Sequence, residues 1–453
     1  MYLTCREDIV IRNEHFVILI FDVRTPDSEY YILNKDMVKP LLMASKGFEE
    51  HKILNRCSRR ESSILDYLKN EGILVNSSKP KPFIRGIPRK NMLSAPYLVT
   101  INPTFRCNLK CWFCFRPKNE SNQFKIENEL TIEDYYKLFT QLKESGVFLL
   151  EIMGGEPFLK DDLLDILKLA NKFPFRITIS TNGTLIDSLI SKELEKLDFK
   201  KILFSVSILG YSKSIHDNIT GIKGSYEKTI SGINELQKCN IPFILNYIVV
   251  RDNIDDKFRL LASFRKYHIS RLNFLFFHEV GWGKSKRSEY LSPYEFRSAV
   301  EDIKKLNTEK YDNYFKITYR APFQWRIDKK IPDDYFAKHY YSRCMLRGRM
   351  DILPDGSASP CLDLAEYGYI EKDAIDKGIE NIWVNSKIIK KARKRTELIL
   401  EQCKGCDTIE ICKNQCLAYV LGKGGNFYSP DDRCPRISEI GFTLPGNKNV
   451  DSN

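Results

Sequence analysis

Short apolar segments alternate with amphipathic segments through the middle of the chain. The apolar segments have the length of strands, and in the others apolar residues recur every three or four positions, as on one face of a helix. Six strands are expected, at residues 97–101, 148–153, 175–180, 202–206, 243–250 and 271–277. Five helices are expected between them, at residues 132–145, 161–172, 186–197, 225–239 and 256–267. This order predicts an α/β fold in which a parallel sheet curls into a partial (β/α)6 barrel of the TIM type.

A smaller unit is predicted before the barrel, over residues 1–77. Its strands are expected at residues 9–11, 16–22, 29–33 and 72–75, and its helices at residues 35–44, 49–55 and 62–70. Three strands followed by three short helices are typical of a winged-helix-like domain. Residues 78–96 begin with a proline-containing, basic stretch and are expected to form a semi-rigid linker that does not pack. The further divisions expected are a barrel domain at 97–310, a bridging segment at 311–343 and a cysteine-rich domain at 344–443.

Length and composition narrow the class of protein. The chain has 453 residues, which suggests roughly three domains, and 43% of its residues are hydrophobic, enough for a sizeable core. No apolar run approaches the ~18 residues of a membrane helix, and charged residues occupy positions 6–8, where a signal peptide needs an apolar stretch. We therefore expect a soluble, cytoplasmic protein. Lysine and arginine outnumber the acids by 71 to 59, which indicates either a solvated basic surface or recruitment of an acidic partner; the densest basic run is 387–395.

Three cysteines in one short loop carry the first candidate chemistry. Cys107, Cys111 and Cys114 have the spacing C-x3-C-x2-C, with Phe113 just before the last cysteine. Thirteen cysteines in a cytoplasmic chain favour metal ligation over disulfides. Three thiolates can hold three irons of a [4Fe-4S] cluster and leave the fourth iron open, which indicates a catalytic cluster. The loop follows the first barrel strand, at the edge of the sheet where barrel enzymes place their active sites.

A glycine-containing turn ends the second barrel strand. Gly154 and Gly155 would let backbone polar groups approach a ligand closely, and the Glu156 carboxylate could accept from an ammonium group. Together with the cysteine loop, the turn Gly-Gly-Glu-Pro157 resembles the radical S-adenosylmethionine (SAM) enzymes, and the resemblance covers about 97–282. It implies that SAM chelates the open iron and that one electron from the cluster cleaves SAM to a 5′-deoxyadenosyl radical, which takes a hydrogen from the substrate.

The same resemblance implies further contacts to SAM. The cofactor-binding residues that it implies are Phe113, Gly154, Gly155, Glu156, Asn182 and Ser207. The segments that contain Asn182 and Ser207 end the third and fourth strands, and each could equally be an ordinary strand-end turn. The sequence departs from the family at Leu209, where an aspartate is common, and at Thr220-Gly221, where Arg-Gly is common. The group that holds the SAM carboxylate could then lie elsewhere, for example at Lys223.

A second set of cysteines begins at Cys344, and a hairpin with a Pro-Asp-Gly turn is expected at 350–358. Zinc ribbons share the C-x2-C pairs but rarely continue as C-x5-C-x3-C. The pattern resembles the SPASM domain, which carries two auxiliary [4Fe-4S] clusters. The resemblance implies one cluster on Cys403, Cys406, Cys412 and Cys434, and another on Cys344, Cys361 and Cys416. The second cluster lacks an identified fourth ligand, since a lone histidine such as His339 is more often structural, and an open iron there could bind a substrate thiol.

Other features of the chain bear on its partners. Cys5, Cys57 and Cys239 fit neither pattern and are expected to be buried as small hydrophobic residues. Residues 30–34 and 64–75 resemble the PqqD-like peptide-recognition element, which binds the leader of a precursor peptide as an added strand. The alternative is a winged helix that binds nucleic acid, for which the basic cluster Arg56, Arg59 and Arg60 is short.

The resemblance implies a radical SAM peptide-modifying enzyme. It would install a thioether or carbon–carbon cross-link in a ribosomally synthesised precursor peptide, with an external electron donor such as flavodoxin or ferredoxin. Neither a membrane nor a nucleic acid is expected as a partner. One alternative is a sulfatase-type maturase that oxidises Cys or Ser in a protein, and another is a metal-binding, winged-helix DNA regulator.

Overall fold

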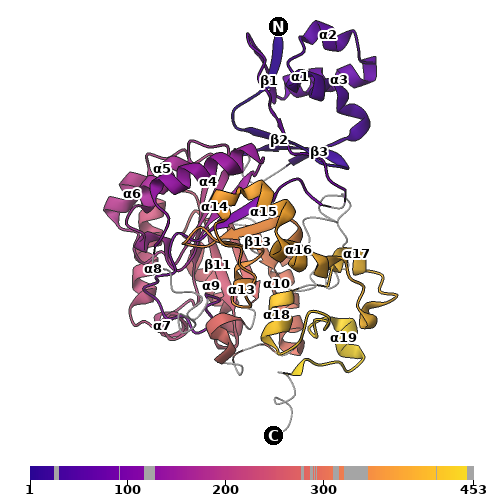
Figure 1. Cartoon of the computed structure of the whole chain (residues 1–453). Coiled ribbons are helices and arrows are strands. Elements are labelled where there is room, and N and C mark those ends of the chain that lie inside the picture. Colours follow the sequence, from indigo (N-terminus) through magenta and orange to yellow (C-terminus); the bar gives the residue numbers. More distant parts are fainter. Residues whose placement is uncertain are drawn as a thin grey trace.

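A computed structural model shows how these segments are arranged. It describes residues 1–24, 30–90, 92–116, 128–276, 280–285, 289, 291, 293–309, 316–320, 345–414 and 416–445. The N-terminal unit sits above a barrel-like α/β body, and the C-terminal unit lies along one side of that body (Figure 1). In the described part of the chain, no helix is long and apolar enough to cross a membrane.

A single nine-stranded sheet forms the barrel body. Seven parallel strands follow one another in space as they do in the chain, and β14 and β15 extend the sheet beyond the first of them. The strands are β7 (Leu98–Ile101), β8 (Leu149–Ile152), β9 (Arg176–Thr181), β10 (Ile202–Ser207), β11 (Phe243–Val249), β12 (Arg271–Phe276), β13 (Lys316–Arg320), β14 (Arg349–Ile352) and β15 (Ala358–Ser359). All six strands expected for the barrel are present, so the predicted α/β class with a parallel sheet is confirmed.

Helices cover the outer face of this sheet (Figure 1). They are α4 (Ile132–Glu144), α5 (Leu163–Ala170), α6 (Ser188–Leu194), α7 (Lys213–Thr220), α8 (Ser225–Lys238), α9 (Lys257–Phe264) and α10 (Pro293–Glu309). Helix α4 begins at a capping box in which Thr131 and Asp134 each accept from the other's backbone N–H. Its apolar face, with Tyr135, Leu138 and Phe139 fully buried, packs in the same core as the outward residues of the strands. The five expected helices are thus found between the expected strands.

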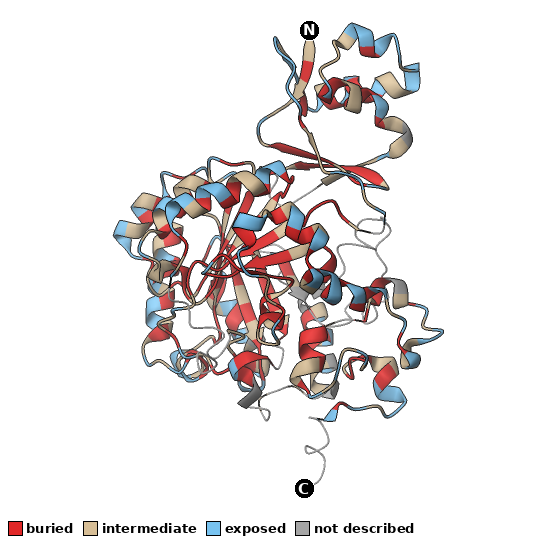
Figure 2. Cartoon of the chain, viewed as in Figure 1, coloured by how far each residue is buried: buried red, intermediate tan, exposed pale blue. Residues whose placement is uncertain are grey.

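The two faces of the sheet have opposite character. Outward residues such as Val99, Leu150 and Ile177 are at most 1% exposed and form the core with the helices. The intervening residues are largely polar: Thr100 pairs with Glu151 across β7 and β8, and paired residues of neighbouring strands share a face. Buried residues line the centre of the body in Figure 2. The interior of the barrel is therefore lined with polar side chains, as a site that binds a polar substrate requires.

The N-terminal unit has a core of its own. Its four-stranded sheet has the order β4-β3-β2-β6, and β1 and β5 form a separate antiparallel pair. The elements are β1 (Tyr2–Cys5), β2 (Ile9–Asn13), β3 (Val17–Asp22), β4 (Tyr30–Asn34), α1 (Lys39–Ser45), α2 (Glu50–Leu54), α3 (Arg59–Asn70), β5 (Leu74–Ser77) and β6 (Ile84–Arg85). The expected order of strands and helices is found, with two strands, β1 and β6, that the sequence did not indicate.

Residues 78–96 pack, so the expectation of an unpacked linker is wrong. Phe83 is 4% exposed and belongs to the core of the N-terminal unit, while Leu93 is fully buried in the core of the barrel. Ile84 and Arg85 pair with β2 as a fourth strand. Proline-rich composition indicated a free segment, but Phe83 and Leu93, which stand between prolines, each enter a core.

A buried ion pair fixes the N-terminal unit on the barrel. Arg12 and Glu14 are both fully buried and bonded to each other. Arg12 also donates to the carbonyl oxygens of Pro96, at 2.9 Å, and Ala95, at 2.6 Å. The Glu14 carboxylate accepts from the backbone N–H of Ser94 at 2.8 Å. These bonds join β2 to the segment that leads into β7, so the two units form a rigid junction.

The C-terminal unit is helical and continuous with the barrel. Its helices are α13 (Leu362–Ala365), α14 (Ala374–Lys377), α15 (Ile379–Asn385), α16 (Lys387–Lys394), α17 (Ile409–Cys412), α18 (Leu417–Gly422) and α19 (Pro435–Glu439). The expected hairpin is β14–β15, and β14 also pairs in parallel with β7. Of the expected bridging segment 311–343, only β13 lies within the described residues. A domain boundary at 344 therefore falls just before a strand of the barrel sheet.

Single turns of 3-10 helix complete the described structure. They are η1 (Lys35–Met37), η3 (Pro157–Leu159), η4 (Arg251–Asp256), η5 (Gly281–Ser285), η7 (Met345–Arg347), η8 (Arg395–Glu397) and η9 (Glu401–Cys403). Three of them touch the candidate site: η3 follows the Gly-Gly-Glu turn, η5 contains Trp282, which bonds to the carbonyl of Cys114, and η9 carries a cysteine.

Candidate functional site

The three cysteines of the first loop lie together beyond the end of β7. Burial raises the pKa of Cys111, and the thiolates of Cys114 and Cys107 raise it further. The three thiols are therefore close enough to interact, as the spacing predicted. All three are partly exposed and none is in a disulfide.

Two neighbouring segments hold this loop in shape. The backbone N–H of Lys110 donates to the carbonyl of Thr220 at 2.9 Å, and that of Trp282 donates to the carbonyl of Cys114 at 2.8 Å. Gly221 ends α7 with φ +68°, and a Cβ there would lie 3.0 Å from the Lys110 carbonyl oxygen. The Thr220-Gly221 pair thus supports the loop through its backbone. Lys223, which the sequence suggested as a group for the SAM carboxylate, is exposed.

The two glycines of the second strand's turn lie against the same loop. A Cβ on Gly154 would lie 2.4 Å from the Thr104 carbonyl oxygen, and one on Gly155 would lie 2.0 Å from that of Arg106. The backbone N–H of Gly155 donates to Thr104, and that of Glu156 donates to Arg106, both at 2.8 Å. The close approach that the glycines allow is therefore to the cysteine loop.

The Glu156 carboxylate points into the protein, so the expectation that it accepts from a ligand's ammonium group is wrong. The residue is fully buried, and its carboxylate accepts from Thr181 Oγ1 at 2.7 Å and from the backbone N–H groups of Asn182, at 2.8 Å, and Phe158, at 3.2 Å. Burial raises the pKa of Glu156 to about 7, although these hydrogen bonds lower it. Glu156 therefore ties the turn after β8 to the end of β9.

Asn182 reaches the cysteine loop from the end of β9. Its Nδ2 donates to Asn108 Oδ1 at 2.9 Å, and Asn108 Nδ2 donates to Thr184 Oγ1 at 2.8 Å. Ser207, half-buried at the end of β10, pairs with Asn246 of β11 on the interior face. Both residues therefore lie where the sequence placed them, at the ends of strands that border the cysteine loop.

An apolar cluster backs the cysteine loop. Phe113 and Trp112 meet edge to face at 5.7 Å between ring centroids and belong to the same cluster as Leu209. Burial lowers the pKa of His216 to about 4, and its neutral Nδ1 accepts from the backbone N–H of Leu209 at 3.2 Å. Leu209, which stands where the family commonly has an aspartate, thus forms part of an apolar wall behind the cysteine loop. Phe113 is part of the same wall.

Arg116 is a site residue that the sequence reading missed. Its Nε donates to Cys114 Sγ at 3.2 Å, and its Nη1 is bonded to the carbonyl of Phe105. A guanidinium beside a thiolate stabilises the negative charge of a cluster ligand. The sequence offered only one signal, a basic residue two positions after the last cysteine. From the sequence alone, such a residue looks the same as an ordinary surface arginine.

Charged side chains occupy one half of the barrel interior. Glu151 accepts from Thr100 Oγ1 at 3.1 Å and lies 3.5 Å from Ser180 Oγ. Arg349 of β14 donates to Asp351 at 2.6 Å and lies 3.8 Å from Glu151. Two carboxylates thus face one guanidinium, which leaves this half of the interior with a net negative charge.

Amides and hydroxyls occupy the other half. Asn246 donates to Ser205 Oγ at 2.6 Å, Asn273 donates to Asn246 Oδ1 at 2.8 Å, and Thr318 is bonded to Asn273 Oδ1. This ladder crosses four neighbouring strands, β10 to β13. The interior therefore offers a continuous row of hydrogen-bonding side chains along these four strands.

Four C-terminal cysteines come together as the resemblance implied. Burial raises the pKa of Cys403, and Cys434 and Cys406 raise it further. Burial likewise raises the pKa of Cys412, and Cys434 is its next cause. Cys403, Cys412 and Cys434 also share a small apolar cluster. The set has the composition of a fully ligated four-iron cluster.

Cys361 and Cys416 form a separate group. Burial raises the pKa of Cys361, followed by Asp363 and Asp351, and Cys416 contributes to the same shift. Burial also raises the pKa of Cys416 to about 11, against Arg433. Cys344 and His339 lie outside the described residues, so the ligand set predicted with Cys344 stays a prediction.

The donor sets fit iron–sulfur clusters. Within the described residues, no three His, Cys, Asp or Glu side chains lie close enough to share one metal ion. A [4Fe-4S] cluster instead places each thiolate on a different iron. Of the remaining cysteines, Cys5 and Cys57 pack against the core of the N-terminal unit and Cys239 against that of the barrel. All three are only partly buried, so the expected burial is found in part.

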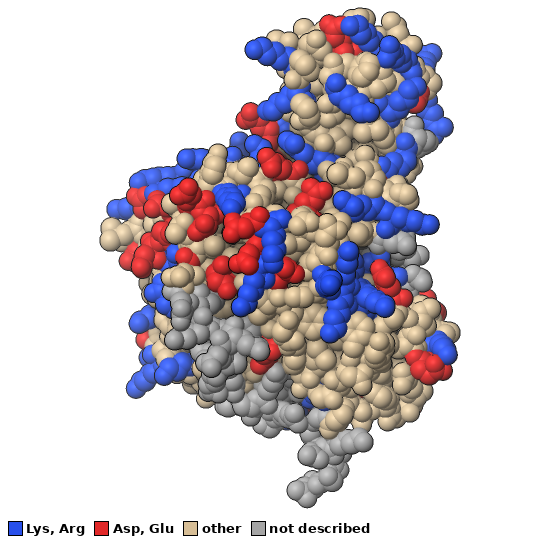
Figure 3. All heavy atoms as spheres, in the orientation of Figure 1, with Lys and Arg blue, Asp and Glu red and all other residues tan. Residues whose placement is uncertain are grey.

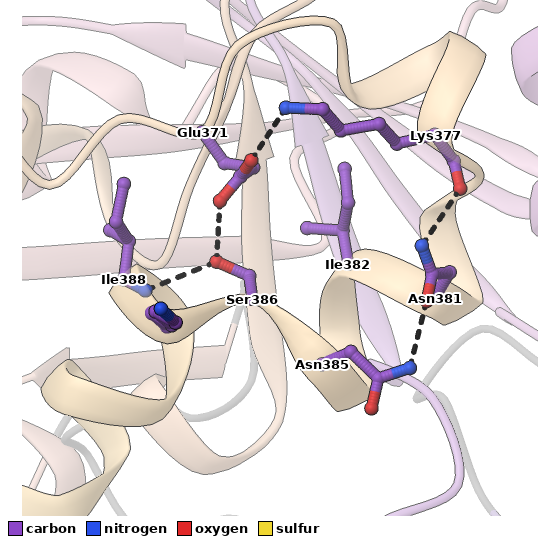
Figure 4. A pocket seen from close by; sticks show the side chains of 8 residues that line it. Glu371, Lys377, Asn381, Ile382, Asn385, Ser386 and Ile388 are labelled. Atoms are coloured by element: carbon purple, nitrogen blue, oxygen red, sulfur yellow. Dashed lines mark hydrogen bonds and ion pairs between the residues drawn. The ribbon is translucent and has the colours of Figure 1, made fainter.

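A hollow of about 460 Å³ lies among α14, α15 and α16. Its charged and polar groups bond to one another: Lys377 and Ser386 both bond to Glu371, at 2.8 and 2.7 Å (Figure 4). Asn385 donates to Asn381 at 2.8 Å. With these groups satisfied internally, the hollow offers no chemistry of its own.

Two family models match the chain. The Radical SAM superfamily model matches residues 101–264, and the SPASM model, an iron-sulfur cluster-binding domain, matches residues 344–407. An AdoMet-dependent heme synthase of Methanosarcina barkeri is 25% identical over 364 residues, which cover 76% of this chain and 97% of that protein. A PqqA peptide cyclase of Granulibacter bethesdensis is 25% identical over 338 residues, which cover 73% of this chain and 85% of that protein.

A solved structure resembles the chain over almost its whole length. SuiB of Streptococcus suis, bound to the precursor peptide SuiA, superposes with a TM-score of 0.79 at 18% identity and covers 96% of this chain and 100% of that chain. Residues 1–77 make up more of the chain than the 4% left unmatched, so the shared fold extends into the N-terminal unit.

Proposed function

We propose that this chain, which belongs to the radical SAM enzymes and carries a SPASM domain, cross-links a ribosomally synthesised precursor peptide. The family models imply SAM and [4Fe-4S] clusters as its cofactors. The observation that carries the proposal is the N-terminal unit, joined rigidly to the barrel through Arg12 and Glu14. The SuiB structure, whose fold includes this unit, is of a protein bound to a precursor peptide.

The peptide leader is proposed to bind at β4. This strand ends the sheet order β4-β3-β2-β6, so one of its edges is not paired within the sheet. Tyr30 to Leu33 are half-buried, and Tyr31 and Leu33 pack against the core of the unit. An edge strand of this kind accepts an extended peptide through backbone hydrogen bonds, and neighbouring side chains give specificity. This is the mode of the PqqD-like recognition element, which the unit is proposed to be.

The core peptide is proposed to enter the polar barrel interior. Bound to the open iron of a cluster on Cys107, Cys111 and Cys114, SAM supplies a 5′-deoxyadenosyl radical. The backbone contacts of Gly154 and Gly155 set the position of the cysteine loop. Asn182 and Ser207, at the ends of β9 and β10, are proposed to contact SAM. The wall of Trp112, Phe113 and Leu209 shields the loop from water on one side.

The C-terminal cysteines are proposed to hold two auxiliary clusters. Cys403, Cys406, Cys412 and Cys434 would hold one, and Cys361 and Cys416, with Cys344, the other. Each cross-link removes two hydrogen atoms: one goes to the radical, and the second leaves as a proton and an electron. An auxiliary cluster held by these cysteines would accept that electron, and an external carrier such as flavodoxin or ferredoxin would exchange electrons with the clusters. A thioether and a carbon–carbon bond both satisfy this balance.

A tetrapyrrole substrate is the second candidate, because one curated relative is a heme synthase. That match leaves 24% of the chain uncovered, whereas the SuiB fold extends into the N-terminal unit. The sulfatase-type maturase is a third candidate, which would act on Cys or Ser of a folded protein. The peptide is favoured over both because a leader-binding edge strand serves no purpose for either alternative substrate.

Co-expression with a short precursor peptide encoded beside the gene tests the proposal. We expect a peptide lighter by two hydrogens in mass spectrometry, 5′-deoxyadenosine in the extract, and about twelve irons per anaerobically purified chain, for three four-iron clusters. The triple variant C107A/C111A/C114A should keep about eight irons and leave the peptide unmodified. Unmodified peptide with the wild-type enzyme, while 5′-deoxyadenosine is released, would exclude this substrate class.

A further inference from the structure

Helix α16 presents a stripe of four lysines to solvent. Lys387, Lys390, Lys391 and Lys394 are all exposed and stand at helical spacing of three and four, which places them on one face. Lys391 Nζ lies 5.4 Å from the centre of the Tyr369 ring. Among the described residues, no carboxylate forms an ion pair with any of the four. Basic side chains gather over this part of the C-terminal unit in Figure 3.

The opposite face of α16 packs towards the cysteines. Ile389 and Ala392 are fully buried. Ala392 and Ile388 belong to one apolar cluster, and Cys361 and Cys416 are packed against the same cluster. The helix therefore exposes its lysines on one side, and on the other it packs against the apolar cluster that Cys361 and Cys416 also contact.

The chain continues from α16 towards the other cysteine group. Arg395 directly follows the helix and is fully buried, and it donates to the carbonyl of Ser429 at 2.6 Å. Asn414, which stands between Cys412 and Cys416 in the sequence, donates to the Arg395 carbonyl at 2.8 Å. The position of α16 is thus fixed relative to the loop that carries cysteines of both auxiliary groups.

We propose that the lysine stripe of α16 is the docking surface for an acidic one-electron carrier protein of the flavodoxin class. The proposal rests on the proposed function, which needs an electron acceptor after each cross-link. The oxidised carrier gains one electron, and the cluster associated with Cys361 and Cys416 loses one. The proton released by the peptide goes to solvent and takes no part in this transfer.

The dimensions and charge of the stripe fit such a partner. Electron-transfer complexes have small interfaces and form weakly, and complementary charge steers their association. An eight-residue helix offers about 12 Å of length, with like charges along its exposed face. A precursor peptide or a nucleic acid could also respond to positive charge, but neither gains from a helix that shares an apolar cluster with Cys361 and Cys416.

The test is a charge reversal with a matched control. The variant K387E/K390E/K391E/K394E of the holoenzyme is compared with K192E/K196E/K228E/K238E, which reverses four exposed lysines, one on α6, one just after it and two on α8. Flavodoxin binding and electron exchange are followed by stopped-flow absorbance at low and high salt. We expect at least a ~10-fold lower association rate for the α16 variant at low salt, no change for the control, and convergence with the wild type at high salt.

Further arms separate the possible outcomes. If the glutamate variant does not fold, the corresponding four-glutamine variant should give an intermediate rate. SAM cleavage driven by dithionite should be the same in all variants; its absence from the wild type would refute the proposed function instead. A wild-type association rate in the folded α16 variant overturns the docking proposal. The docking proposal is also overturned if the α16 variant loses precursor-peptide binding while its flavodoxin binding is unchanged.

Discussion

Arg116 Nε donates a hydrogen bond to Cys114 Sγ at 3.2 Å, and the same guanidinium is bonded to the carbonyl of Phe105. The arginine therefore joins the last ligand of the cysteine loop to the loop's first residues. Its charge lies next to a sulfur that the proposed function places on iron. Hydrogen bonds and charge at the ligand sulfurs are among the factors that set the potential of a cluster.

Replacing Arg116 with glutamine should make this cluster harder to reduce. Loss of the positive charge removes a group that stabilises the reduced, more negative cluster, so the reduction potential should fall by roughly tens of millivolts. An electron paramagnetic resonance titration of the anaerobic enzyme measures this potential. Arg116→Lys keeps the charge and serves as the control; an unchanged potential in Arg116→Gln would contradict the assigned role.

Gly155→Ala should disrupt the cysteine loop. The new Cβ would lie 2.0 Å from the backbone oxygen of Arg106, which cannot move without shifting the loop. We expect about 1–3 kcal/mol of destabilisation and loss of four irons per chain, because the loop no longer matches the cluster. Gly368→Ala is the control for iron content: it strains the backbone at φ +78°, but its Cβ meets no atom within 4 Å, so the iron content should not change. An iron content equal to the wild type in Gly155→Ala would refute the prediction.

Glu156 should make stability depend on pH. Its folded-state pKa of about 7 lies above the ordinary value of 4.5, so the folded state binds the proton more tightly. The resulting stabilisation is fully present below pH 4.5 and is lost as the pH rises through 7. Urea unfolding at pH 5 and pH 8 measures the difference. Glu156→Gln should reduce this difference by on the order of 2–3 kcal/mol, and equal slopes in both proteins would show that Glu156 does not titrate in this range.

Arg12→Met should loosen the junction between the N-terminal unit and the barrel. It leaves Glu14 buried without its cation, which costs about 3–5 kcal/mol, and it removes the bonds to Ala95 and Pro96. Chemical unfolding measures the loss. The double variant R12M/E14L removes both charges and should recover part of it. Stability within about 1 kcal/mol of the wild type in Arg12→Met would show that the pair does not hold the junction.

The sequence predicted those features that depend on neighbouring residues. Apolar periodicity located the strands and helices of the barrel, because the pattern of each element involves residues that are close together in the sequence. Cysteine spacing located the first loop, and the resemblance to the SPASM domain separated Cys403, Cys406, Cys412 and Cys434 from Cys361 and Cys416. The proline-rich segment was misjudged because composition does not reveal that Phe83 and Leu93 each have a core to enter.

What the sequence by itself determined is the order of the elements and the residues able to hold clusters. The tertiary structure alone decided the direction of the Glu156 carboxylate, the approach of Arg116 to Cys114, and the packing of α16 against the apolar cluster that Cys361 and Cys416 also contact. Each of these depends on contacts between residues that are separated in the chain or lie on a loop folded back on itself. Such contacts are set by packing and hydrogen bonding in three dimensions, which no local pattern encodes.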